Sequence, residues 1–168
     1  NLNSLTKWVQ DQFDTRLNWD DVKRIKDWWG GKLIIKGIMD PDDAKMAQKC
    51  GADALVVSNH GGRQLDGVNS SISTLPEIKK AVSNMEVLMD GGISSGQDII
   101  KAIAMGAEGV MIGRSFVYGL SAGGKEGVTK SLEILNKELD MTMALCGRRD
   151  IKDVGRDIIK DCPFFEKN

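Results

Sequence analysis

Gly51-Ala-Asp-Ala-Leu-Val-Val-Ser58 is the stretch that decides the fold, and it recurs as Gly106-Ala-Glu-Gly-Val-Met-Ile-Gly113. The two copies are offset by 55 residues (106 − 51), and each joins a glycine turn to a short apolar run. One strand earlier, Lys36-Gly37-Ile38 and Asp90-Gly91-Gly92 are offset by 54 residues (90 − 36). Each copy therefore holds two βα units of about 27 residues, which is typical of a (β/α)8 barrel.

Four apolar runs are predicted to form buried parallel strands: Leu33–Lys36, Ala54–Ser58, Val87–Asp90 and Val110–Gly113. Because the runs are almost continuously apolar, we expect helices to cover both faces of the sheet. Four βα units are half of the eight in a closed barrel. The predicted fold class is therefore α/β, a half barrel of four parallel strands with flanking helices. A flavodoxin-like open sheet is the alternative.

Helix signals separate the predicted strands. Thr74 and Glu77 form a predicted capping box, with Pro76 in the first turn of its helix. Val128–Leu139 carries one stripe of a long amphipathic helix. Three further helices are expected to begin at N-cap residues and to end near glycines; the caps are Asn18, Asp40 and Ser95.

Composition narrows the functional class. The chain has 168 residues and a formal net charge of −1, so it offers no general electrostatic attraction for nucleic acid. No apolar run is long enough to predict a membrane-spanning helix, and no secretory signal is visible. The three cysteines form no CxxC pair, which favours a reduced cytoplasmic setting. With one histidine and no acidic cluster, we expect no metal site.

Polar and glycine residues follow each predicted strand, where the reactive groups of a βα barrel collect. His60, in Ser58-Asn59-His60-Gly61-Gly62-Arg63, is a candidate general base because imidazole titrates near neutral pH. A hydrogen-bonded structural histidine is the alternative. Arg63 is a candidate for binding a substrate carboxylate through its two-pronged guanidinium; a solvated surface charge is the alternative.

The other strand ends predict an anion site. Lys36 ends an apolar run, an unfavourable place for an ammonium group unless an anion meets it or it reaches solvent at the barrel rim. Asp90-Gly91-Gly92-Ile93-Ser94 leads into one predicted helix, and Gly113-Arg114 leads into another. Backbone N–H groups at such turns can bind a phosphate, and barrels commonly bind phosphate after their last two strands.

These motifs together resemble the FMN-dependent α-hydroxy-acid dehydrogenases and oxidases. The string Ser58-Asn59-His60-Gly61-Gly62-Arg63-Gln64-Leu65-Asp66 is the most specific, and Leu139–Gly147 also matches. The stretch Gly96–Gly119 is most similar to the bacterial L-lactate dehydrogenases. The resemblance runs from about residue 10 to about residue 160 and covers only the C-terminal half of the family's (β/α)8 barrel, its strands five to eight.

The resemblance implies FMN as the cofactor, an L-2-hydroxy acid as the substrate and L-lactate as the first choice. It implies that His60 is the catalytic base and that Arg63, with His60, binds the substrate. The residues that it implies for FMN binding are Lys36, Ser58, Asp90, Gly91, Gly92, Ser94, Gly113 and Arg114. The family usually has Arg in place of Ser94, so this chain lacks one phosphate contact.

The predicted organisation is an N-terminal segment (1–17), a half barrel (18–160) and a C-terminal tail (161–168). Because strands one to four are missing, we expect pairing with an N-terminal half or self-association. The chain alone is expected to be inactive, and a non-catalytic half barrel from a split or decayed gene is the rival hypothesis. The expected location is the cytoplasm, with peripheral attachment to the inner face of the cell membrane as the alternative.

Overall fold

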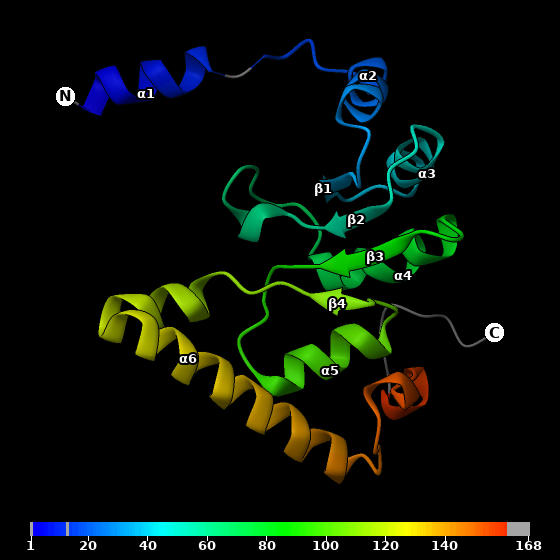
Figure 1. Cartoon of the computed structure of the whole chain (residues 1–168), viewed down its shortest axis with the longest axis vertical. Helices are drawn as coiled ribbons and strands as arrows, with labels where there is room; N and C mark the ends of the chain where they lie inside the picture. Colours follow the sequence, from blue (N-terminus) through cyan, green and yellow to red (C-terminus); the bar gives the residue numbers. More distant parts are fainter. Residues whose placement is uncertain (1, 13, 161–168) are drawn as a thin grey trace.

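The computed structural model describes residues 2–12 and 14–160, so the predicted tail at 161–168 lies outside the described residues. Four strands form one parallel sheet in sequential order, β1-β2-β3-β4 (Figure 1). Their bounds are Ile34–Ile38, Ala54–Val57, Glu86–Met89 and Gly109–Val110. The prediction of four parallel strands with flanking helices, as in half of a (β/α)8 barrel, is confirmed.

Helices connect and flank the strands. Between strands run α3 (Pro41–Lys49), α4 (Ser71–Ala81) and α5 (Gly96–Ala104). Before the sheet come α1 (Leu2–Asp11) and α2 (Trp19–Trp29), and after it comes α6 (Arg114–Leu145). Short 3-10 turns lie at His60–Gly62, Ile151–Asp153 and Arg156–Ile158. In Figure 1, α1 lies beyond α2, away from the sheet.

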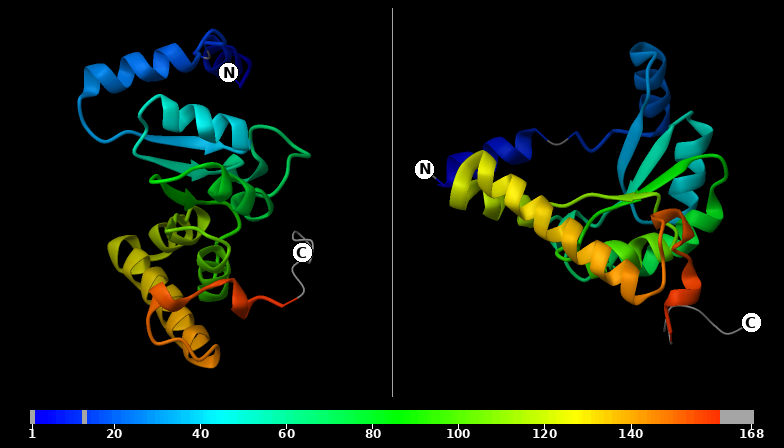
Figure 2. Two further views of the ribbon diagram at one scale, coloured as in Figure 1. Left: turned by 90° about the vertical axis from the view of Figure 1, so that its right-hand side faces the viewer. Right: turned by 60° about the horizontal axis from the view of Figure 1, so that its bottom comes forward.

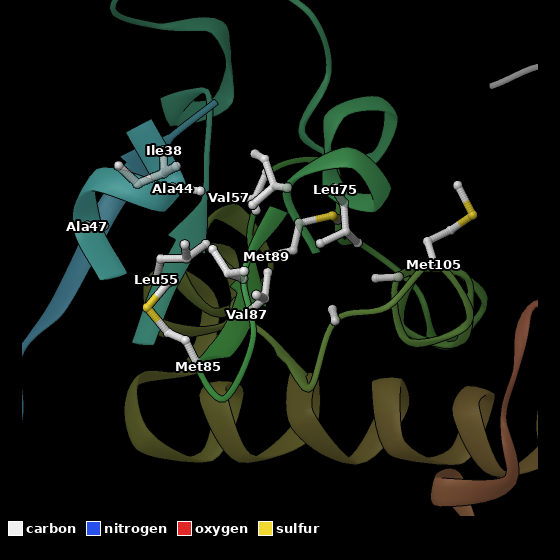
Figure 3. Close-up of a cluster of buried hydrophobic side chains, with 14 of the residues drawn as sticks. Ile38, Ala44, Ala47, Leu55, Val57, Leu75, Met85, Val87, Met89 and Met105 are labelled. Atoms are coloured by element: carbon white, nitrogen blue, oxygen red, sulfur yellow. The ribbon is translucent and has the colours of Figure 1, made fainter. Parts of the chain in front are cut away.

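The core lies between the sheet and α3, α4 and α5. Leu55, Val57, Val87 and Met89 point to this face and are almost fully buried (Figure 3). From the helices they meet Ala44, Ala47, Leu75, Ile78 and Ala102. The expectation that helices cover both faces is wrong: on the opposite face Ile34 is 53% exposed, and Lys36 and Glu86 are exposed as well. That face is the one a closed barrel would turn inward.

Each of the four strands differs from its predicted range by one to three residues at one end or both, and one helix start differs as well. β2 ends at Val57 rather than Ser58, and β3 covers Glu86–Met89 rather than Val87–Asp90. β1 continues past Lys36, because Gly37 adopts φ 97° and the register shifts there as in a β-bulge. β4 covers only Gly109–Val110, so Gly113 lies outside the strand and is instead the N-cap of α6. Helix α4 begins at Ser71 rather than at Thr74: Ser70 accepts the Ser73 N–H, which places Pro76 inside the helix. The predicted caps Asn18, Asp40 and Ser95 are confirmed.

Helix α6 turns back on itself, as Figures 1 and 2 show. Gly123 and Gly124 leave helical geometry, and the two arms meet at Gly119 and Gly127. The longer arm packs on α5, where Gly96 lies directly against the backbone of Glu138 and Leu139. The Gly96 N–H donates to the Glu138 carboxylate at 2.9 Å. These contacts fix the start of α5 and hence the loop that joins β3 to α5.

Replacing Gly96 with alanine should destabilise the chain. A Cβ there would overlap the backbone at Leu139, so α5 and α6 would have to separate. Overpacking of this kind costs about 3 kcal/mol. Urea unfolding of Gly96→Ala measures the loss, and Gly123→Ala is the matched control because a Cβ there meets nothing within 4 Å. Equal stability of the two variants would contradict the close approach of α5 and α6.

Lowering the pH should remove the contribution that Asp98, at the start of α5, makes to the stability of the fold. Burial alone would raise its pKa from 3.8, but hydrogen bonds from Ser94 and Ser95 lower the pKa below that value. A carboxyl group whose pKa is lower in the folded state than in the unfolded state stabilises the fold at any pH above its unfolded-state pKa. This stabilisation is lost as the pH falls through the folded-state pKa. Asp98→Asn should therefore be less stable than the wild type at pH 7, and the difference should shrink below about pH 4. Urea unfolding across pH 7 to 2 tests this, and a constant difference would contradict it.

Candidate active site

The parallel register brings three polar side chains to one edge of the sheet. Lys36, Val56 and Leu88 are aligned on neighbouring strands. Since side chains alternate along a strand, Ser58 and Asp90, two residues further on, face the same side as Val56 and Leu88. The carboxyl ends of β1, β2 and β3 thus deliver an ammonium group, a hydroxyl and a carboxylate to one place.

Lys36 lies at the centre of this group. Its Nζ is 2.8 Å from Asp90 Oδ2 and donates to Ser58 Oγ, also at 2.8 Å. The Lys36 side chain is 44% exposed, and that of Asp90 is 19% exposed. Asp90 Oδ1 is buried and has no hydrogen-bond partner. A buried carboxylate oxygen without a donor is costly, so this atom is suited to a hydroxyl or N–H of a ligand.

The loop after β2 carries His60. Its backbone is left-handed, with φ 56°, and it begins a 3-10 turn at His60–Gly62. The His60 N–H donates to Ser58 Oγ at 3.2 Å, so the same hydroxyl contacts both His60 and Lys36. The imidazole is exposed, as a group that receives a proton from a ligand must be.

Arg63 follows the turn. Its backbone N–H donates to the His60 carbonyl oxygen at 3.3 Å, and its side chain is exposed. The structure therefore places Arg63 on the same loop as His60, within one turn of the chain, with its guanidinium in solvent.

The glycine turn after β3 is adjacent to this loop. Gly91 has φ 89°, and a Cβ there would lie 3.1 Å from Ser71 Oγ and 3.2 Å from Asn59 Oδ1. Gly92 has φ 79° and faces open space. Ser94 is bonded to the first turn of α5: its N–H and hydroxyl donate to Asp98 Oδ2 at 3.0 and 3.1 Å.

The start of α6 offers free donors. Gly113 is its N-cap and makes no side-chain capping hydrogen bond, and a Cβ there would meet nothing within 4 Å. The first backbone N–H groups of a helix lack partners inside the helix and favour anions. Arg114, the first residue of α6, is exposed. Among the described residues, no hydrogen bond or ion pair is found that joins Gly113 or Arg114 to Lys36, Ser58 or Asp90.

Sequence reasoning missed two residues of this site. Asn59 and Ser71 both contact the His60 loop and crowd Gly91. Asn59 stands inside the recognised string, but its hydrogen bonds depend on the turn that the loop makes. Ser71 is 12 residues further along (71 − 59) in a serine-rich stretch, and nothing in that spacing points to Asn59.

Two properties of the described residues limit the kinds of site that they can form. Over 2–12 and 14–160, no group of three or more His, Cys, Asp and Glu side chains is arranged to hold a metal ion. Within the same ranges, no helix combines the length and the apolar character needed to cross a membrane.

Comparison with known proteins places this geometry in a family. The sequence model of the FMN-dependent dehydrogenases matches residues 1–161. L-lactate dehydrogenase of Caulobacter vibrioides (strain NA1000 / CB15N) is 48% identical over 95% of this chain and 42% of its own length. L-lactate dehydrogenase of Stenotrophomonas maltophilia (strain R551-3) is 47% identical over 93% and 41%.

Solved structures agree with the sequence matches. The monotopic membrane protein (S)-mandelate dehydrogenase superposes with a TM-score of 0.88 at 37% identity, over 93% of this chain and 42% of that one. Mandelate oxidase gives a TM-score of 0.80 at 42% identity, over 83% and 41%. The chain thus spans about two fifths of the length of the relatives that it matches. By its sequence and its fold, the chain belongs to the FMN-dependent dehydrogenase family, of which it is a C-terminal half.

Proposed function

We propose that this chain supplies the proton-accepting and carboxylate-binding half of an FMN-dependent L-2-hydroxy-acid dehydrogenase, with L-lactate as its substrate. The observation that carries the proposal is the hydrogen-bonded set of Lys36, Ser58 and Asp90 beside the exposed His60. The L-lactate dehydrogenase relatives support the substrate assignment.

The described residues fit FMN at two places. The unpartnered Asp90 Oδ1 suits a ribityl hydroxyl, and Lys36 Nζ suits an electron-rich edge of the flavin. Gly92 and Gly113 face open space where a phosphate can approach backbone N–H groups, and Arg114 follows Gly113. Gly91, Ser58 and Ser94 complete the proposed set. FMN, when bound, supplies the acceptor for the two electrons that leave the substrate.

His60 and Arg63 have different roles toward the substrate: Arg63 binds it and His60 accepts its proton. The guanidinium of Arg63 binds the substrate carboxylate through two parallel hydrogen bonds and so fixes its orientation. An imidazole nitrogen of His60 takes the proton that the substrate gives up as it is oxidised. The left-handed turn at His60 keeps both side chains on one exposed loop.

The proposed partner is the other half of the barrel. On the β1 side of the sheet, Ile25, Trp28 and Trp29 of α2 and Ile34 of β1 are 46–77% exposed. A closed barrel has eight strands and eight helices. Apart from α1, which lies away from the sheet, the described residues provide four strands and five helices, α2 to α6. Two copies would therefore provide ten helices, two more than a barrel holds. A partner with four strands and three helices between them completes the count, which favours an N-terminal half over self-association.

For location, we propose the cytoplasm. Attachment to the inner face of the cell membrane is the alternative, and it is supported by the monotopic character of the related (S)-mandelate dehydrogenase. The rival hypothesis is a non-catalytic half barrel. FMN titration and the kinetics of His60 and Arg63 variants distinguish it from an enzyme.

Binding of FMN to the isolated chain should be weak, because half of the barrel is absent. Ser94→Arg should tighten it about tenfold or more, since one charge-assisted hydrogen bond contributes roughly 1.5–3 kcal/mol. Titration of flavin fluorescence measures both values. Ser83→Arg, an exposed site before β3, is the matched control and should leave the affinity unchanged. Equal gains from both substitutions would indicate general charge attraction and no phosphate contact near Ser94.

Loss of the imidazole should abolish most turnover in a complex with an N-terminal half. His60→Gln is expected to lower kcat about 10²–10⁴-fold while flavin content changes little, because proton transfer is lost. Arg63→Lys should mainly raise KM for L-lactate, since a point charge replaces a planar fork.

Steady-state kinetics with a dye acceptor measure both changes. Arg149→Lys, at an exposed position beyond α6, controls for the loss of any guanidinium. Near-normal kcat in His60→Gln would show that His60 is a structural residue.

A further inference from the structure

The backbone of His60 needs an explanation. Among the described residues, only His60 and Asn84 combine a side chain with a positive φ, and both have φ 56°. Asn84 lies in an exposed turn, and asparagine tolerates the left-handed region better than other non-glycine residues. Histidine is also found in that region more often than most residues, but a side chain there still costs free energy, which the contacts around His60 must offset.

Asn59 makes the contacts that shape this turn. Its Oδ1 accepts the Gly61 N–H at 3.0 Å, across the peptide that follows His60. Its Nδ2 donates to the Asn69 carbonyl oxygen at 3.3 Å, at the far end of the loop. The amide side chain of Asn59 thus spans the base of the loop and fixes the residues on both sides of His60.

Ser71 ties the same loop to the sheet and to the glycine turn. It is 2% exposed, and its Oγ accepts the Asn59 N–H at 3.2 Å. The Ser71 hydroxyl and Asn59 Oδ1 both lie against Gly91, with no room for a Cβ without displacement. The His60 loop, the start of α4 and the turn after Asp90 therefore meet at two small polar side chains.

We propose that Asn59 is a positioning residue for His60, and that Ser71 anchors Asn59 and links the His60 loop to the Gly91 turn. Asn59 acts through the backbone, by holding the left-handed conformation that presents the imidazole. What His60 does once presented rests on the proposed function, whereas how it is held does not. The link also ties the group that contacts substrate to the turn proposed to contact FMN.

The test uses the fact that His60 is the only histidine of the chain. The Cε1–H correlation in a ¹H–¹³C spectrum therefore reports this one imidazole, in the 168-residue protein and without flavin. The wild type should give one narrow cross-peak. Asn59→Ala removes the two side-chain hydrogen bonds to Gly61 and Asn69, and Ser71→Ala removes the one from the Asn59 N–H. Each variant should raise the population of alternative His60 conformers about fivefold or more, seen as broadening or extra peaks.

Gln48→Ala is the matched control. Gln48 also exchanges two hydrogen bonds with a distant backbone, that of Ser83, at 2.7 and 3.2 Å. Gln48→Ala should lower the stability of the chain about as much as Asn59→Ala does, and it should leave the His60 peak unchanged. Asn59→Asp keeps an acceptor for the Gly61 N–H, so it should restore a single peak.

An unchanged single peak in Asn59→Ala or in Ser71→Ala would overturn the proposal. If either variant fails to fold, as judged by its amide spectrum, hydrogen exchange in the wild type decides the matter. The Gly61 amide should then be protected, and exchange at the rate of an unstructured chain would overturn the proposal. Failure of the proposed function would appear separately, as retained turnover in His60→Gln.

Discussion

The alignment of Lys36, Val56 and Leu88 across three parallel strands is the constraint on which the site depends. It fixes which face receives Ser58 and Asp90, because side chains alternate along each strand. The β-bulge at Gly37 lets β1 continue beyond Lys36, whose ammonium group then contacts Ser58 and Asp90. A one-residue slip of any strand would turn its polar side chain into the apolar core.

Electrostatics favour the proposal that this cluster binds a ligand over the alternative that it is a structural ion pair. The Lys36–Asp90 pair is partly exposed, so it contributes little to stability, on the order of 1 kcal/mol or less. The pair leaves one Asp90 oxygen buried and unsatisfied, and Gly92 nearby faces open space. Such an arrangement suits the binding of a ligand, whereas it contributes little to the stability of the fold. The FMN cofactor of the family has the hydroxyl and phosphate groups that these features suit.

The sequence predicts what depends on local chemistry. The apolar runs locate the strands, and the N-cap side chains of Asn18, Asp40 and Ser95 locate three helix starts. It fails where two local signals compete and where distant contacts decide. Ser70 is an N-cap as local as the predicted one at Thr74, and it starts α4 earlier than predicted. Asn59 and Ser71 were missed because only the folded loop brings them to Gly91.

The central claim is that this half barrel carries the substrate chemistry of a hydroxy-acid dehydrogenase and needs the other half to perform it. The most direct measurement is anaerobic addition of L-lactate to the chain assembled with FMN and the N-terminal half of a relative. Flavin absorbance should bleach with L-lactate, but it should persist with D-lactate or with either half alone. Stoichiometric FMN binding by the assembled halves without bleaching by L-lactate would contradict the account.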